Sequence, residues 1–62
     1  MTFEKALTIV RKLAKTQAFY YNLLQNLEDI NKNDKEQVKI IEQDFEFSNV
    51  KDEKDLIFYF EN

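Results

Sequence analysis

The chain has 62 residues and a formal net charge of −3, and it contains no cysteine, histidine, glycine or proline. Without cysteine it forms no disulfides or thiolate metal sites, and without histidine it lacks the commonest general base and transition-metal ligand. Without glycine it cannot form the glycine-rich loops that bind phosphates. We therefore expect a non-enzymatic protein with no catalytic residue, no cofactor site and no metal site.

The length allows one domain, close to the lower size limit for folding without disulfides or metals. Because glycine and proline are absent, the chain must turn with Asn, Asp, Ser and Lys. This favours helices joined by short polar links over hairpins that need positive φ angles. The expected fold is a single all-α domain over residues 1–62, with one long N-terminal helix and two short helices.

Residues 2–30 carry apolar side chains at helical spacing and predict one long amphipathic helix. Thr2 can cap its first turn, and Glu4 suits the positive end of the helix dipole. Such a helix would be on the order of 43 Å long, and the remaining chain looks too short to cover its apolar stripe. We therefore expect a homodimer that packs along this helix, with an interface formed by Phe3, Val10, Leu13, Gln17, Tyr20, Leu24 and Leu27.

Gln17 is the polar member of that stripe. One polar side chain among apolar layers can fix the register and the number of helices in a helical dimer. The alternative is that Gln17 lies at a bend of the helix and faces water. The sequence leaves both interpretations open.

The polar segment 31–34 ends the first helix, and Asp34 with Gln37, or Asn33 with Glu36, resembles a capping box. The apolar spacing that follows predicts a second helix at about 34–44. Because the link is short, this helix should run antiparallel to the first.

The C-terminal third allows two interpretations. Phe45 and Phe47 alternate with a polar residue as in a short strand, but the polar residues that follow favour a loop with both rings folded onto the core. Asp52 predicts the cap of a third helix at about 53–61. The alternative is a strand there, because Ile, Phe and Tyr favour sheets, and the fold would then be α+β with a short C-terminal hairpin.

Charge is unevenly distributed along the chain. Residues 1–27 contain four basic residues and one acidic residue, whereas residues 28–62 contain five lysines and eleven acidic residues. Arg11, Lys12 and Lys15 lie within about one turn and could contact nucleic-acid phosphates. We expect no nucleic-acid binding, because three charges without a recognition-helix pattern are a weak signal and the acidic half would repel the backbone. A small nucleic-acid-binding regulator remains the alternative.

The chain has no apolar run of membrane-spanning length and no signal-peptide pattern, so we expect a cytoplasmic protein without membrane contact. An acidic surface can dock into a basic groove of another protein by charge complementarity. The competing interpretation is that the acidic residues only cap helices and maintain solubility. The residues expected to contact a partner protein are the acidic Asp44, Glu46, Asp52, Glu53 and Asp55 and the aromatic Phe19 and Phe58.

Two segments resemble small uncharacterised proteins of phages and prophages in low-GC Gram-positive bacteria. Residues 14–20 read Ala-Lys-Thr-Gln-Ala-Phe-Tyr, and the C-terminal segment contains Val-Lys-Asp at 50–52, Asp-Leu-Ile at 55–57 and Glu61. The chain departs from that pattern at Ala18, where glycine is usual, so a helix break there is less expected. The resemblance implies no known activity. It predicts a gene that travels with mobile elements, many of whose small acidic proteins bind and disable host proteins.

The function expected from these observations is a protein-binding module, encoded by a phage or mobile element and present in the host cytoplasm. It would inhibit or redirect a host protein, such as a defence nuclease, by covering part of its surface. The alternatives are the nucleic-acid-binding regulator and a structural assembly helper.

Overall fold

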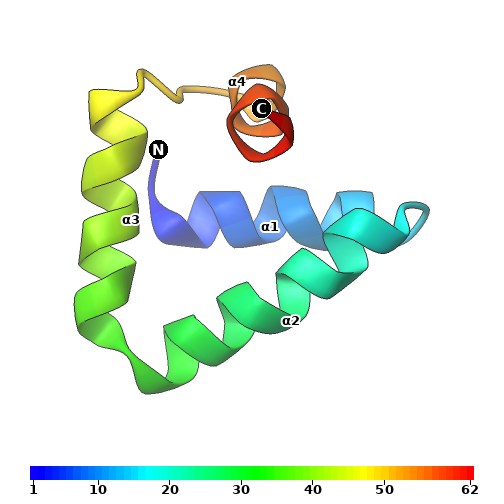
Figure 1. Ribbon diagram of the computed structural model, residues 1–62, viewed down its shortest axis with the longest axis horizontal. Helices are drawn as coiled ribbons and strands as arrows, with labels where there is room; N and C mark the ends of the chain where they lie inside the picture. Colours follow the sequence, from blue (N-terminus) through cyan, green and yellow to red (C-terminus); the bar gives the residue numbers. More distant parts are fainter.

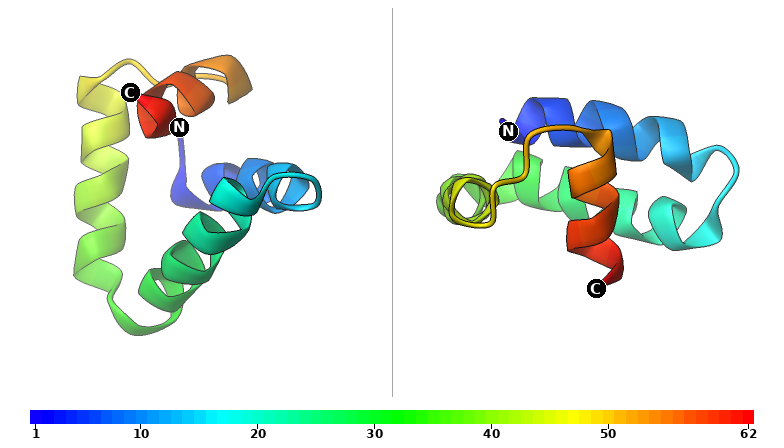
Figure 2. Two further views of the ribbon diagram at one scale, coloured as in Figure 1. Left: turned by 45° about the vertical axis from the view of Figure 1, so that its right-hand side comes forward. Right: turned by 90° about the horizontal axis from the view of Figure 1, so that it is seen from above.

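The computed structural model describes all 62 residues and contains four helices and no strand. The helices are α1 (Phe3–Ala14), α2 (Ala18–Asn33), α3 (Lys35–Phe47) and α4 (Glu53–Glu61). α2 runs back beside α1, and α3 stands at the end of this pair where α1 begins and α2 finishes (Figure 1). α4 lies across α1 on the side away from α2 (Figures 1 and 2). The all-α prediction is confirmed, and the α+β alternative is wrong.

The prediction of one helix over residues 2–30 is also wrong, because the chain reverses after Ala14. Residues 15–17 form a tight link in which the amides of Thr16 and Gln17 both donate to the carbonyl of Leu13. The backbone of Gln17 is extended, with φ −132° and ψ 118°, and this residue starts α2. The break occurs even though Ala18 made a break at this position less expected. The periodicity missed it because Leu13 and Tyr20, on either side of the link, are still seven residues apart.

Nine apolar residues from all four helices and the link before α4 form one buried core. The reversal lets the two halves of the predicted stripe cover each other, while α3 and α4 close the rest. The apolar stripe is therefore sheltered within one chain, and the reason for expecting a second copy along it no longer holds. The core residues are Phe3, Ala6, Leu7, Val10, Tyr20, Leu27, Phe45, Val50 and Leu56.

The residues expected at a dimer interface occupy three environments. Four belong to the core, two lie half-buried against it, and one is exposed in the link between α1 and α2. Gln17 is the exposed one, at a turn of the chain, which agrees with the second interpretation of this residue. The four core residues are Phe3, Val10, Tyr20 and Leu27, and the two half-buried ones are Leu13 and Leu24.

The caps predicted at Thr2 and Asp52 are confirmed, and of the two caps considered before the next helix the structure shows Asp34 rather than Asn33. The side chains of Thr2, Asp34 and Asp52 accept hydrogen bonds from backbone amides three residues later, at 3.1, 3.1 and 2.9 Å. These bonds satisfy amides that have no partner inside the first turn of a helix. The cap residues fix where α1, α3 and α4 begin, whereas Gln17 gives α2 no side-chain cap.

α3 continues to Phe47, three residues beyond the predicted boundary at residue 44. Asn49 ends it with a positive φ of 58°, a conformation that asparagine tolerates better than most residues other than glycine. The amide of Asn49 donates to the carbonyl of Glu46, and that of Val50 donates to the carbonyl of Phe45. This pair of bonds is the Schellman motif, and the buried side chains of Val50 and Phe45 flank it.

Candidate binding surface

The end of α3 presents the most exposed aromatic side chain of the protein. Phe47 is 89% exposed, and Ile40, seven residues earlier on the same face of α3, is 56% exposed. On α4, Phe58 is 69% exposed. The prediction that Phe47 folds onto the core is wrong, because the helix continues through it and a helix presents residues 45 and 47 on different faces.

Tyr59 stands between these two helices. Its ring packs edge-on against the buried Phe45, with the ring centroids 5.2 Å apart, and against Phe60 at the same separation. Its hydroxyl donates a hydrogen bond to the carboxylate of Asp44 on α3. Aromatic pairs of this kind contribute about 0.5–1.5 kcal/mol each beyond their buried area. The Tyr59 ring is therefore held in one position relative to α3.

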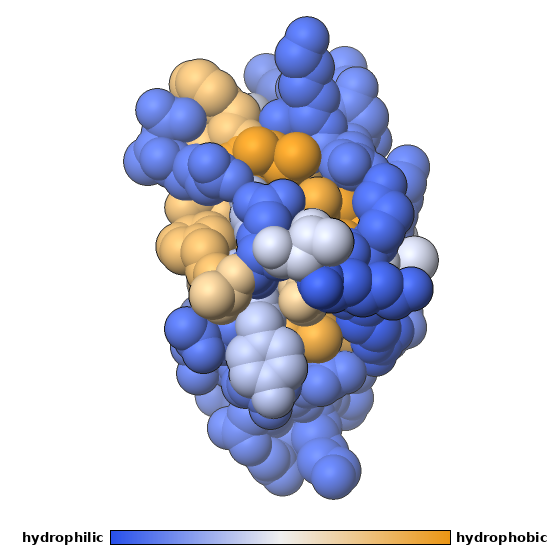
Figure 3. Space-filling model, turned by 90° about the vertical axis from the view of Figure 1, so that its right-hand side faces the viewer, coloured by the Kyte–Doolittle hydropathy of each residue, from blue (hydrophilic) through white to orange (hydrophobic).

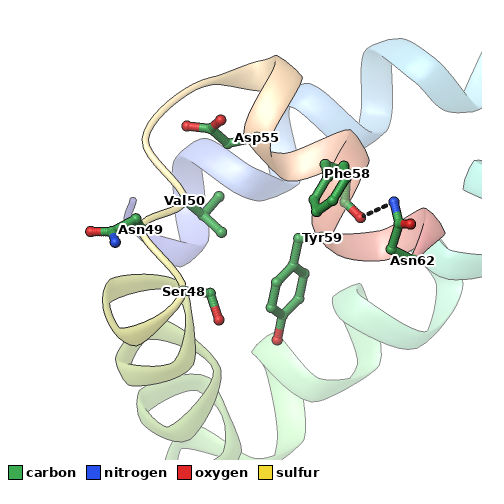
Figure 4. Close-up of a pocket in the computed structure, with 7 residues that line it drawn as sticks. All are labelled: Ser48, Asn49, Val50, Asp55, Phe58, Tyr59 and Asn62. Carbon is green, nitrogen blue, oxygen red and sulfur yellow. Dashed lines mark hydrogen bonds between the residues drawn. The ribbon is translucent and has the colours of Figure 1, made fainter.

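Tyr59 lines two open depressions. One, of about 470 Å³, runs along α3 and is lined by apolar and amide side chains together with Asp44. The other, of about 360 Å³, lies between the end of α3 and α4, where Figure 4 shows the Tyr59 ring reaching from α4 toward α3. We name the region that contains both depressions the α3–α4 surface. Its defining residues are Ile40, Asp44, Phe47, Asp55, Phe58 and Tyr59.

The α3–α4 surface contains two carboxylates, and neither forms an ion pair. The linings of the two depressions include the carboxylates of Asp44 and Asp55 and no lysine or arginine. Asp44 accepts the hydroxyl of Tyr59, and Asp55 accepts the backbone amide of Lys51 at 3.1 Å. Burial, the hydrogen bond from Tyr59 and the charge of Asp44, in decreasing order, raise the pKa of Tyr59 to about 12. The tyrosine is thus a neutral hydrogen-bond donor at physiological pH.

Of the seven residues expected to contact a partner, three meet in this surface: Asp44, Asp55 and Phe58. Glu46 faces a different depression, together with Met1 and Thr2.

The other acidic residues of that set have contacts within the chain. Asp52 caps α4, and Glu53 forms an ion pair with Lys12. Both roles agree with the structural interpretation of the acidic residues. Asp55 also contributes to the fold, since its carboxylate accepts the Lys51 amide, yet it still lines the depression beside Phe58.

Phe19 lies apart from this group, at the start of α2. It is 52% exposed, and its ring packs edge-on against Tyr20 with a centroid separation of 5.0 Å. The hydroxyl of Tyr20 donates to Glu61 at 2.5 Å, which ties the start of α2 to the end of α4. Seen from the side of the α1–α2 link, hydrophobic surface shows in the upper and central parts of the face and along its left edge, while hydrophilic side chains cover most of the rest (Figure 3).

Three residues of the α3–α4 surface were missed from the sequence: Ile40, Phe47 and Tyr59. Ile40, Asp44 and Phe47 follow one another at spacings of four and three residues, which places them on one face of a helix. That signal was present but depended on extending α3 to residue 47. Nothing in the sequence indicated that Tyr59 would pair with Asp44, because this contact depends on how α4 packs against α3.

The basic residues Arg11, Lys12 and Lys15, at the end of α1 and just after it, are partly engaged within the chain. Arg11 Nε lies 3.3 Å from Glu28 Oε2, and Lys12 forms an ion pair with Glu53. Exposed ion pairs of this kind contribute only about 0.2–1 kcal/mol to folding stability. Their main effect here is to offset the positive charge of Arg11 and Lys12. Two of the three cations considered for nucleic-acid contact therefore already face a carboxylate.

No family model, no curated protein and no solved structure matches this chain. The resemblance to small phage proteins therefore stays a prediction. None of the four helices combines the length and the apolar character that a membrane-spanning helix needs. No group of three or more acidic side chains is placed to hold a metal ion.

Proposed function

We propose that this protein is a non-enzymatic protein-binding module that acts through its α3–α4 surface. In the phage or mobile-element setting that the resemblance predicts, it would work in the host cytoplasm. It would cover part of a host protein and thereby inhibit or redirect it.

The observation that carries this proposal is the exposure of Phe47. Burying a phenylalanine side chain contributes about 1.5–3 kcal/mol, and a helix end can accept almost any polar residue instead. Phe47 nevertheless stays 89% exposed, and Ile40 and Phe58 are more than half exposed in the same surface. Exposed apolar side chains that line such depressions together with polar residues are typical of protein contact sites.

The position of these side chains supports the same proposal. Aromatic residues dominate the energetics of protein interfaces, and their contribution is greatest when they are ordered before binding. The Phe45–Tyr59 packing and the Tyr59–Asp44 hydrogen bond fix α4 against α3. A partner would therefore meet two helices whose relative position is already set, and their backbone would lose little conformational entropy on binding.

Affinity capture with matched variants tests the proposal. The wild-type chain, the Phe47→Ser/Phe58→Ser double variant and a Tyr21→Ser control would each be used as bait in lysate of cells that produce the protein. Tyr21 is 56% exposed on α2, outside the α3–α4 surface, so the control removes a comparable exposed ring. We expect at least one protein to be retained by the wild type and the control and to be lost with the double variant. Identical sets of captured proteins for all three baits would contradict the proposal.

A further inference from the structure

The charge of the α3–α4 surface indicates what kind of partner it accepts. Residues 40–62 contain seven acidic residues and two lysines, and Glu53 is the only one of the seven in an ion pair. The carboxylates within the surface, Asp44 and Asp55, accept hydrogen bonds only from neutral groups, the Tyr59 hydroxyl and the Lys51 amide. A cationic group placed against them would gain attraction without displacing an existing ion pair. A second copy meeting this surface with its own identical face would bring like charges together.

The shape of the surface indicates how the partner's backbone is folded. The chain has no strand, so a partner cannot bind by adding a strand to a sheet edge. The apolar groups instead lie on two helices, α3 and α4, and line two depressions that share Tyr59. An amphipathic helix places apolar side chains at i, i+3, i+4 and i+7, so successive turns can fill neighbouring depressions of this kind.

We propose that the segment occupying the α3–α4 surface is a cationic amphipathic helix of a partner protein. Its apolar side chains contact Ile40, Phe47 and Phe58, and its lysine or arginine side chains contact Asp44 and Asp55. This inference rests on the proposed function and adds the chemical class of the partner segment.

Fluorescence anisotropy with synthetic peptides tests this proposal. The probe is a labelled peptide of about 16 residues, with leucine and lysine in helical order, and its counterpart has glutamate at every lysine position. We expect the lysine peptide to bind the wild-type chain at least about tenfold more tightly than the glutamate peptide, and to gain helical circular dichroism on binding. Phe47→Ser should weaken binding of the lysine peptide about tenfold, and Asp44→Asn should weaken it about threefold to tenfold.

Two controls separate this site from general attraction to an acidic protein. Asp29→Asn removes the same charge from an exposed position on α2, and Tyr21→Ser removes an exposed ring outside the surface. Both controls should bind the lysine peptide like the wild type. Equal weakening by Asp29→Asn and Asp44→Asn would overturn the proposal, as would equal affinity for the two peptides. A bound peptide that stays unstructured would overturn the helical part.

A dimer of the protein alone that disappears on Phe47→Ser, detected by sedimentation, would identify a second copy as the occupant and overturn the proposal. The peptide experiment and the affinity capture can fail independently of each other. If affinity capture retains a partner that depends on Phe47 and Phe58 while the lysine peptide does not bind, only the partner class assigned here is wrong.

Discussion

Two tyrosine hydroxyls attach α4 to the rest of the protein at the level of single residues. Tyr59 donates from α4 to Asp44 on α3, and Tyr20 donates from α2 to Glu61 on α4. In each case the tyrosine must stay protonated, because its anion would stand beside a carboxylate. Burial is the largest cause of the raised pKa of both tyrosines, and the neighbouring carboxylate adds to it.

This arrangement predicts a loss of stability in alkali. A pKa raised from 10.0 to about 12 means that the folded state holds the Tyr59 proton where the unfolded state releases it. The contribution of Tyr59 is therefore complete below pH 10 and is lost as the pH rises through about 12. We expect Tyr59→Phe to lose less stability than the wild type between pH 8 and pH 11.5, measured by urea unfolding. Tyr21→Phe, which removes an exposed hydroxyl, should behave like the wild type, and an unchanged slope for Tyr59→Phe would contradict this account.

Neighbouring residues of α4 differ sharply in what they contribute to folding. Leu56 is fully buried, whereas Phe58 two residues later is 69% exposed. We expect Leu56→Ala to lower the free energy of unfolding by about 2–5 kcal/mol. Phe58→Ser and Phe47→Ser should change it by less than about 0.5 kcal/mol. Urea unfolding monitored by circular dichroism measures all three, and a large loss for Phe47→Ser would mean that this ring contributes to folding rather than to binding.

At the scale of helices, the sequence identified where most of them begin but not how two of them end. The capping roles of Thr2, Asp34 and Asp52 could be predicted because a cap depends only on one side chain and the backbone amide three residues later. The end of α1 could not be predicted, because the link at residues 15–17 contains no glycine or proline. The spacing of apolar residues also continues unchanged from one side of this link to the other. The end of α3 was missed because Asn49 takes the place that glycine usually occupies.

The conformation of Asn49 gives a test at this scale. A residue with a Cβ atom pays about 1–2 kcal/mol in the left-handed region, whereas glycine does not and asparagine visits it more readily than most. We expect Asn49→Ala to lower the free energy of unfolding by about 1 kcal/mol and Asn49→Gly to leave it unchanged or raise it. Thermal or urea unfolding of the two variants checks this. Equal stabilities for the alanine and glycine variants would show that the left-handed turn is not retained in solution.

The whole molecule is as compact as a folded domain of its length should be. Its radius of gyration is 10.8 Å, close to the value of about 10.6 Å expected for a folded domain of this size. The expected rod would have exposed its apolar stripe, whereas the turn after α1 folds that stripe inward. The candidate site could be predicted only in part for the same reason. Charge and aromatic content are visible in the sequence, but which of these residues meet depends on how α3 and α4 pack.

The α3–α4 surface keeps its most exposed rings, Phe47 and Phe58, uncovered, and its contact with another protein is the central claim. Site-specific photo-crosslinking in the producing cell tests it most directly, with a benzoylphenylalanine at Phe47 in one variant and at Asn22, an exposed position of α2, in the other. We predict a covalent adduct with a different protein from position 47 and none of that mass from position 22. The absence of any adduct from position 47, or the same adduct from both positions, would contradict the account.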